Sequence, residues 1–447
     1  MKKQMKLGLS MRYLGYHLGS WRHPEVQPDG TSDFRCFLDV VQTAERAKFD
    51  MVFLADGIGI RSNDEPRGSL ARSRQNVELE PLTLLSALAP MTRSIGLVAT
   101  ASTTYNEPYH IARKYGSLDQ ISSGRAGWNV VTSWSDQEAW NFNRSKHLSY
   151  ETRYERAEEF VDVVTGLWDS WDQDAFVHDK EAGIFYDESK LHVLGHAGKH
   201  FSVRGPLSVR RSPQGRPILV QAGTSEVGQR IAAQHCDAIF AAKHDLHDAR
   251  SYYSSVKSRM PAFGRRPEDL VIMVGLTTVV GRTRQEAKAK HEQLEGLIDP
   301  LVGLSLLYRS FGDLSDLPLD GPVPEPLAGH GGLQSSARLY YDLAIKNGWT
   351  IRQLYTKIGM AQEHKTVVGT AGDVVDEMEA WVDAGAADGF NVTPTHLPHG
   401  IDDFVEFVVP ELRRRGRFRH EYEGLTLREN LGLRVPTSRY AEKSAVA

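Results

Sequence analysis

The stretch Gly124-Arg125-Ala126-Gly127-Trp128-Asn129-Val130-Val131-Thr132-Ser133 decides the fold of this chain. Two serines and a glycine at 122–124 end a helical pattern. A short apolar run then begins, and it finishes in Asn, Thr and Ser. A buried strand that carries polar side chains at its carboxyl end is how an α/β protein builds a pocket.

Three other apolar runs end in the same way. Residues 51–55 end at Asp56, and residues 95–101 run into Ser102-Thr103-Thr104-Tyr105. Residues 218–220 end at Gln221-Ala222-Gly223-Thr224-Ser225. Polar chemistry at the ends of several strands is typical of the active site of an α/β barrel.

Strand and helix patterns alternate along the chain, which predicts βαβ units and a parallel sheet. We expect strands at 5–10, 51–55, 95–101, 126–131, 218–221, 237–241, 271–279 and 389–392, with helices at 34–47, 82–91, 108–121, 151–171, 225–235, 246–260 and 401–414. Eight such strands predict a (β/α)8 TIM-like barrel. An open doubly wound sheet would need Gly-rich nucleotide turns, which the sequence lacks.

Two insertions interrupt the single barrel domain that we expect over residues 1–447. The first, at 172–217 after the fourth unit, contains a hairpin-like segment at 199–207. The second, at 297–365 after the seventh strand, is rich in Pro and Gly over 317–332. Long irregular loops in compact folds are lids or disordered segments. The helical pattern at 340–355 favours an active-site lid.

Composition narrows the class of protein. The 447 residues are 40% hydrophobic and 25% charged, as in soluble globular enzymes, and the net charge of −4 implies no general affinity for nucleic acid or membranes. The only two cysteines, Cys36 and Cys236, lie in apolar helical patterns, which predicts buried reduced thiols. We expect a cytoplasmic protein, since no apolar stretch has the length of a membrane span or signal peptide.

The segment from Gln221 to Ser225 has two interpretations. The free N–H groups of the following helix, together with the Ser225 hydroxyl, form an anion site. Alternatively, Ser225 is a plain N-cap with Glu226 in the first turn. Asp56 also has two interpretations, because it can cap a turn or face a heterocycle at the barrel mouth. No second carboxylate stands at a matching strand end to form an acid pair with it.

The sequence lacks the motifs of metal-dependent hydrolases and of serine hydrolases. His17 and His23 do not form the H-x-H pair of barrel metallohydrolases, and neither H-E-x-x-H nor G-x-S-x-G occurs. No metal site and no nucleophile are therefore expected. What remains is a barrel whose strand ends are lined by Thr, Ser, Asn and Trp. Such a site suits a bound cofactor that carries its own reactivity.

An ordered set of motifs along nearly the whole chain resembles one family. The motifs are Trp21-Arg22-His23-Pro24, Phe53-Leu54-Ala55-Asp56, Ser102-Thr103-Thr104-Tyr105-Asn106-Glu107-Pro108-Tyr109, Gly127-Trp128-Asn129-Val130-Val131-Thr132-Ser133, Arg153-Tyr154-Glu155-Arg156-Ala157-Glu158-Glu159-Phe160, Gln221-Ala222-Gly223, Ala387-Asp388-Gly389-Phe390-Asn391, Val408-Val409-Pro410-Glu411-Leu412 and Thr426-Leu427-Arg428-Glu429-Asn430-Leu431-Gly432-Leu433. They resemble the bacterial-luciferase-like flavin-dependent monooxygenases, in the group of nitrilotriacetate monooxygenase component A, dibenzothiophene-sulfone monooxygenase, pristinamycin synthase and long-chain alkane monooxygenase.

The resemblance implies an oxygenase component that uses dioxygen and reduced FMN, supplied by a separate NAD(P)H:flavin reductase, to oxygenate a small organic substrate. Xenobiotic substrates and substrates that contain sulfur or nitrogen fall within its range. It also implies a homodimer or homotetramer. Asp56 and Thr100 would contact the isoalloxazine, and Tyr154 and Ser225 would hold the phosphate end. The remaining cofactor-binding candidates are Thr103, Asn129, Ser133, Tyr150 and Gly223.

The substrate side of the site is less specific. Tyr150 and Trp134 stand where relatives often carry His, so no catalytic residue is assigned. Trp134 would form a wall, while Tyr16 and His17 are the nearest polar candidates for contact with the substrate. Arg61, Arg67, Arg72 and Arg74 follow the second strand and either attract an anionic substrate or belong to a solvated loop.

Three alternatives to the monooxygenase stay open. A flavin- or deazaflavin-dependent oxidoreductase would transfer hydride without inserting oxygen, and measured oxygen uptake separates it. A non-catalytic flavin-binding protein would modify no substrate. A metal-dependent barrel hydrolase would be sensitive to chelators.

Overall fold

The computed structural model describes residues 3–12, 14–75, 77–327, 332–361 and 364–441. Eight parallel strands close into the predicted barrel, in the order β1-β2-β3-β4-β7-β8-β9-β11 and back to β1. The strands are β1 (Lys6–Met11), β2 (Met51–Leu54), β3 (Gly96–Ser102), β4 (Ala126–Val131), β7 (Ile218–Gln221), β8 (Ala238–Ala241), β9 (Val271–Val280) and β11 (Gly389–Val392). Each lies within one or two residues of its expected position.

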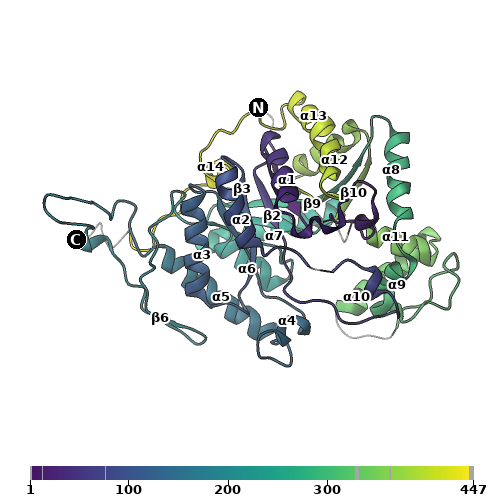
Figure 1. Ribbon diagram of the computed structural model, residues 1–447, viewed down its shortest axis with the longest axis horizontal. Helices are drawn as coiled ribbons and strands as arrows, with labels where there is room; N and C mark the ends of the chain where they lie inside the picture. Colours follow the sequence, from purple (N-terminus) through teal and green to yellow (C-terminus); the bar gives the residue numbers. More distant parts are fainter. Residues whose placement is uncertain (1–2, 13, 76, 328–331, 362–363, 442–447) are drawn as a thin grey trace.

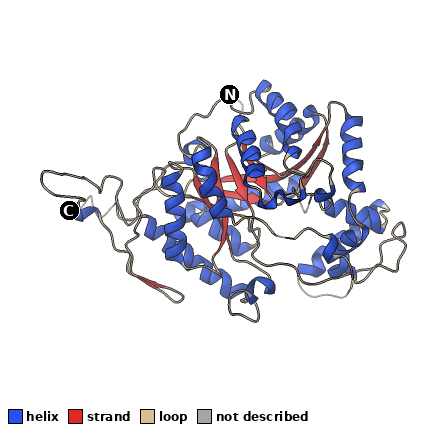
Figure 2. Ribbon diagram, viewed as in Figure 1, coloured by secondary structure: helices blue, strands red, loops and turns tan. Residues whose placement is uncertain are grey.

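Helices surround the strands (Figures 1 and 2). The expected ones are α1 (Phe34–Arg46), α2 (Pro81–Leu88), α3 (Pro108–Ile121), α5 (Tyr150–Trp168), α6 (Glu226–His235) and α7 (Leu246–Arg259). The helix expected at 401–414 is divided into a 3-10 turn (His399–Ile401), a π-helix (Phe404–Val408) and α13 (Val409–Arg414).

Several elements were not expected from the sequence. They are α4 (Asp136–Trp140), α8 (Arg284–Gly296), β10 (Lys365–Gly369), α12 (Ala371–Asp383) and α14 (Leu427–Asn430). The strand β10 pairs in parallel with residues 276–280 of β9, so this half of β9 extends past the barrel. The insertion was predicted to end at 365, and the extra strand β10 begins at that residue.

The barrel interior changes character along its axis. Its amino-terminal and middle parts are apolar and contain Met51, Phe53, Val98, Ile218, Val220, Ala238, Phe240, Val271 and Met273. Leu427 and Leu431, from the segment around α14, pack into the same cluster and close that end. Alternation of side chains along strands then places Ser10, Thr100 and Asn129 in the upper interior. The polar end of the barrel is thus the carboxyl end of its strands.

Trp128 corrects one expectation about the mouth. The sequence suggested strand ends lined partly by Trp, but Trp128 points outward and is fully buried among Tyr115, Phe160 and Trp168. Its neighbour Asn129 takes the inward position because successive side chains alternate between the two faces of a strand.

The two insertions differ in structure. Residues 172–217 form an extended arm in which β5 (His196–Ala197) pairs antiparallel with β6 (Ser202–Val203) (Figure 1). The hairpin predicted at 199–207 therefore begins earlier, and its turn occupies 198–201. The second insertion contains α9 (Pro300–Phe311), α10 (Gly332–Asn347) and α11 (Ile351–Ala361), which share a small apolar core. The pattern at 340–355 is two helices separated near Gly348, and positions 328–331 lie outside the described residues.

Two further expectations concern thiols and membranes. Cys236 is buried, as expected, whereas Cys36 is only half-buried in α1, and neither of them forms a disulfide. In the described part of the chain, no helix has the length and apolar character that crossing a membrane requires.

Candidate active site

A chain of hydrogen bonds joins three neighbouring strands at the mouth. The Nδ2 of Asn129 donates to Oγ1 of Thr100 at 2.8 Å, and Thr100 donates to the carbonyl of Leu54 at 2.7 Å. Asn129 is 4% exposed and Thr100 is 5% exposed. The Oδ1 of Asn129 is buried without a hydrogen-bond partner, which is costly unless a bound group satisfies it.

Ser133 follows β4 in a left-handed backbone conformation, with φ of 58°. Its hydroxyl donates to Oγ of Ser102 at 2.9 Å and lies 3.2 Å from Oε1 of Glu138. Glu138 also accepts the N–H groups of Trp134 and Ser135 at 3.2 Å each. The sequence analysis missed this buried carboxylate, although the Ser135-x-x-Glu138 capping box that fixes it is a readable signal.

Asp56 lies directly after β2, in the open mouth. Burial raises the pKa of its carboxyl to about 6, although the Gly57 N–H opposes this, and the carboxylates of Glu80, Glu78 and Glu138 add to the rise. The sequence indicated no second carboxylate near Asp56. The structure places one there because Glu138 comes from a short helix after β4, not from a strand end.

The helices α5 and α6 lie side by side, held by a two-pronged ion pair between Arg230 and Glu158 at 2.5 and 2.7 Å. Tyr154 precedes Glu158 by one helical turn and so shares the face of α5 that is turned toward α6. Tyr150 and Tyr154 pack with ring centroids 4.5 Å apart, and the guanidinium of Arg153 lies over both rings. Tyr154 therefore lies level with the first turn of α6.

Ser225 is the N-cap of α6, and its Oγ accepts the Gly228 N–H at 3.2 Å. The carboxamide of Gln221 lies beneath this helix start and fills the space where a Cβ on Gly223 would be. The Oε1 of Gln221 is buried without a partner. Glu226 is held away by Arg259 at 2.5 Å, so no carboxylate blocks the helix start. The structure confirms Ser225 as the N-cap of α6. The anion site stays a prediction, to which the other first-turn N–H groups of the helix would contribute.

Tyr16 and His17 follow β1 in the chain, and His364 directly precedes β10. Tyr16 hydrogen-bonds Ser10 and meets the ring of His364 edge-on at 5.7 Å, and burial raises its pKa. Burial lowers the pKa of His17 to about 3 and that of His364 to about 4, so both imidazoles are neutral. The Nε2 of His17 and the Nδ1 of His364 have no partner. The sequence analysis missed His364 because it follows an insertion, and the space for its ring comes from Gly275 of β9.

Thr103 is fully buried, and its hydroxyl donates to the carbonyl of Val131 at 3.2 Å. Its hydroxyl is thus already engaged by the backbone. Trp134, in contrast, is 71% exposed and stands beside the outer cavity. The two predicted residues lie at different depths.

The outer cavity, of about 400 Å³, lies between the segments that follow β2 and β4 and the helix α9, and we interpret it as the entrance to the mouth. Trp134, Arg61 and Arg74 line one side, and Ser305, Leu306, Tyr308 and Arg309 of α9 line the other. Burial and the guanidinium of Arg309 lower the pKa of Arg61, while Asp64 opposes this. Asp64 itself is engaged by the N–H groups of Gly68 and Leu70 at 2.8 Å. Arg72 instead pairs with Asp299 at 3.4 Å, and Arg67 is not part of the cavity wall.

Comparison with known proteins identifies the family. The sequence profile of the luciferase-like monooxygenases matches residues 13–388. The chain belongs to the luciferase-like monooxygenase family. This luciferase-like monooxygenase is 48% identical to N-acetyl-S-(2-succino)cysteine monooxygenase of Bacillus subtilis over 444 residues, which cover 99% of both chains. It is 46% identical to nitrilotriacetate monooxygenase component A of Aminobacter aminovorans over 449 residues, again 99% of both.

A solved structure extends the similarity to a flavin-bearing relative. The crystal structure of riboflavin lyase with modified FMN and the substrate riboflavin superposes with a TM-score of 0.83 at 30% identity, covering 98% of each chain. Membership confirms the predicted family and the barrel fold. The protein is a flavin-dependent monooxygenase of the luciferase-like group.

Proposed function

We propose that this luciferase-like monooxygenase binds reduced FMN across the ends of β2, β3, β4 and β7 and oxygenates a small organic substrate carrying several carboxylates. The observation that carries the proposal is the junction of three features: an open helix start at Ser225, a polar strand-end network at Thr100 and Asn129, and an arginine-lined entrance.

The residues at the mouth fit FMN in chemistry. Ser225, the first-turn N–H groups of α6 and the Tyr154 hydroxyl would hold the phosphate, since helix starts favour anions. The unpartnered Oδ1 of Asn129 would accept an N–H of the heterocycle beside Asp56. Gly223 and Ser133 lie on the same rim. Thr103 would contribute through its position, since its hydroxyl is bonded to the backbone.

When bound, reduced flavin supplies the electrons that activate dioxygen. The protein orients the flavin and the substrate and excludes water from the site. The insertion helix α9 forms the outer wall opposite Trp134, which supports the predicted lid role of the second insertion. His17 and His364 are neutral, and each has a buried ring nitrogen without a hydrogen-bond partner. Such groups can orient a polar substrate or hold a proton at a nitrogen.

The entrance favours anionic substrates. Arg61, Arg74 and Arg309 line the same cavity, where Glu65 is the one carboxylate among the lining residues. Asp64, the acidic neighbour of Arg61, is engaged by backbone N–H groups. Guanidinium groups bind carboxylates through paired hydrogen bonds. The two relatives described above act, by their names, on nitrilotriacetate and on an S-(2-succino)cysteine, which are carboxylate-rich compounds of nitrogen and sulfur. A separate NAD(P)H:flavin reductase would supply the reduced FMN.

The test is a substrate panel with reduced FMN generated by an unrelated flavin reductase. Polycarboxylate amines and thioethers would be compared with their methyl esters and with uncharged alkanes, and products would be identified by mass. We expect oxygenated or cleaved products from free acids and little turnover of the esters. Turnover of the uncharged compounds alone would contradict the substrate class, and absence of flavin binding would contradict the whole proposal.

A further inference from the structure

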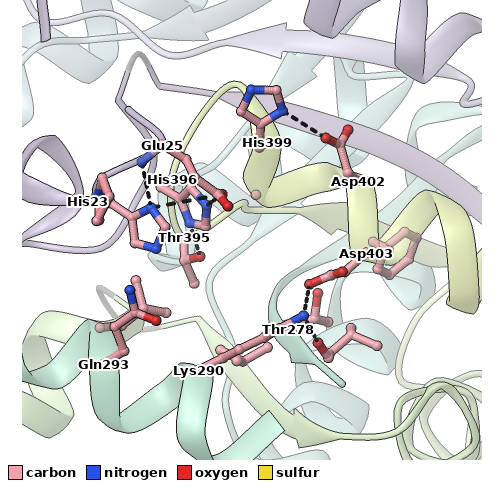
Figure 3. A pocket seen from close by; sticks show the side chains of 16 residues that line it. His23, Glu25, Thr278, Lys290, Gln293, Thr395, His396, His399, Asp402 and Asp403 are labelled. Atoms are coloured by element: carbon pink, nitrogen blue, oxygen red, sulfur yellow. Dashed lines mark hydrogen bonds and ion pairs between the residues drawn. The ribbon is translucent and has the colours of Figure 1, made fainter. Parts of the chain in front are cut away.

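A second cavity, of about 350 Å³, lies between the segment after β1, the carboxyl end of β9, α8 and the segment after β11 (Figure 3). Its lining shares no residue with the outer cavity at the arginine-lined entrance. On one wall the side chains of His23, Glu25 and His396 converge, and we call them the His-Glu-His cluster.

The three side chains offer ligand atoms at short separations. The Oε2 of Glu25 lies 3.3 Å from Nε2 of His396 and 4.0 Å from Nδ1 of His23. All three ligand atoms lie within 4.8 Å of one another. Ligand atoms around a tetrahedral zinc ion, each about 2 Å from the metal, are roughly 3.4 Å apart. In this structure the Nδ1 of His23 also accepts the backbone N–H of Glu25 at 3.3 Å. Coordination therefore requires small side-chain movements and the replacement of that contact by the metal ion.

The surroundings hold the two rings in place. The imidazoles of His23 and His396 stack with centroids 4.0 Å apart and an interplanar angle of 23°. Oγ1 of Thr395 lies 3.1 Å from Nδ1 of His396, which directs the Nε2 of that ring toward Glu25. A hydrogen bond on the far nitrogen is the usual support of a metal-binding histidine. The histidine side chains are 10% and 12% exposed, whereas Glu25 is 58% exposed and free to adjust.

The charge of the cavity also favours a cation. Asp402 and Asp403 line it, and its lysine, Lys290, is already bound to Asp403 at 2.6 Å and to Glu286 at 3.3 Å. His399 faces Asp402 at 3.0 Å, apart from the cluster. A cation bound at Glu25 would thus meet no unpaired ammonium or guanidinium on this wall.

We propose that His23, Glu25 and His396 bind one divalent ion of the zinc class, with water at the remaining position. Two imidazole nitrogens and one carboxylate oxygen are ligands that such ions prefer. The sequence analysis expected no metal, because the two halves of the site lie 371 residues apart in the chain.

The ion would fasten together two segments that form one wall of the barrel mouth. The N–H groups of Tyr16 and His17 already donate to the carbonyls of Pro394 and Thr395 at 2.8 and 3.0 Å. The cluster joins the same two segments a few residues further on. The role is therefore structural, and it positions Tyr16 and His17 without touching the flavin or the substrate.

The test uses the full-length protein, treated with EDTA and then dialysed. Cobalt(II) would be titrated as a spectroscopic probe and zinc(II) as its competitor. We expect one cobalt ion per chain with the visible absorption of a four-coordinate site, and displacement by zinc. Glu25→Gln, an exposed change that keeps the fold, should weaken cobalt binding about tenfold or more, and His396→Ala should abolish it.

His399→Ala is the matched control, since it removes a histidine of the same cavity but outside the cluster, and it should bind like the wild type. Zinc should raise the melting temperature of the wild type and not that of Glu25→Gln. A wild-type protein that binds no cobalt, or a Glu25→Gln variant that binds it unchanged, would overturn the proposal. In that case a direct hydrogen bond between His396 and Glu25 explains the cluster.

Discussion

The carboxamide of Asn129 donates to the hydroxyl of Thr100 at 2.8 Å, and this bond determines which way the amide faces. Because Nδ2 donates to Thr100, Oδ1 is the amide atom that has no hydrogen-bond partner in the barrel mouth. Thr100 is fixed in turn by the Leu54 carbonyl at 2.7 Å. Three strands thus fix one unpartnered acceptor in the barrel mouth, where we propose that the heterocycle of FMN binds.

Replacing Thr100 should disturb that orientation. Thr100→Val keeps the shape but leaves the Asn129 amide and the Leu54 carbonyl without a partner, which costs about 1–3 kcal/mol of folding free energy. We expect a lower melting temperature and weaker FMN binding, measured by thermal unfolding and by flavin fluorescence titration. Thr100→Ser, which keeps the hydroxyl, should retain most of both. Equal flavin affinity in the Val and Ser variants would count against the account.

The helix start at Ser225 should matter for the phosphate. Ser225→Ala and Tyr154→Phe should each weaken FMN binding by about 1 kcal/mol or more, because each removes a hydrogen bond to a charged group. Thr283→Ala, which removes the N-cap of the distant helix α8, controls for the stability cost of a lost cap. FMN affinity that stays at the wild-type value in both site variants would refute the assignment.

The arginine-lined entrance predicts a charge-dependent KM. Arg61→Gln and Arg309→Gln should raise the KM for a polycarboxylate substrate about tenfold or more, since a hydrogen bond to a charged group contributes about 1.5–3 kcal/mol. The effect should shrink with added salt. Arg72→Gln is the control, because Arg72 pairs with Asp299 and should leave KM unchanged. A rise in KM of equal size in all three variants would show a general effect of surface charge instead.

Asp56 predicts a pH-dependent stability. Its pKa is raised to about 6 in the folded protein from an ordinary value of 3.8. The folded state therefore holds the proton more tightly than the unfolded chain, so stability falls as the pH rises from about 4 to about 6. We expect Asp56→Asn to melt higher than the wild type at about pH 8 and equally at about pH 4, while its oxygenase activity falls. A variant that is less stable at about pH 8 would contradict the raised pKa.

At the end of the barrel opposite the mouth, a buried ion pair joins α14 to the residue before β8. Arg428 of α14 bonds both carboxylate oxygens of Asp237 at 2.8 and 3.0 Å, and the pair lowers the pKa of Asp237 to about 2 despite burial. Asp237→Asn should cost about 3–5 kcal/mol of unfolding free energy, measured with urea. The wild-type contribution should be lost as the pH falls from about 4 toward 2, because the folded pKa is depressed.

Asp320→Asn is the matched control for that pair. It breaks the exposed ion pair with Arg352 at 2.8 Å, where the two side chains are 73% and 45% exposed. Such pairs contribute about 1 kcal/mol or less. Comparable losses in the two variants would show that the closure by α14 does not depend on the buried pair.

The sequence predicted the barrel because each inner strand is a short apolar run with a polar end. Buried strands show that pattern whatever surrounds them, and 126–131 and 218–221 were predicted to the residue. The strand β10 does not show this pattern of an apolar run with a polar end. Most of its residues are half-buried, because it pairs with the part of β9 that extends past the barrel. The helix expected at 401–414 was divided by a π-helix, which periodicity does not reveal.

Only those residues of the candidate site that stand at the ends of strands could be predicted from the sequence. Thr100, Asn129 and Ser225 lie at such ends, and the structure brings them to one mouth. Glu138 and His364 come from a short helix and from the end of an insertion, and tertiary packing alone places them there. The His-Glu-His cluster is the extreme case, because its members come from opposite ends of the chain.

The central claim is that the protein inserts an atom of dioxygen with electrons from reduced FMN. The most direct measurement supplies reduced FMN, a turned-over polycarboxylate substrate and isotopically labelled ¹⁸O₂, and follows the product by mass spectrometry. The account predicts one labelled oxygen atom in the product and oxygen consumption tied to substrate turnover. Product formed without the label, or equally well without oxygen, would contradict it and would favour a hydride-transferring flavoenzyme.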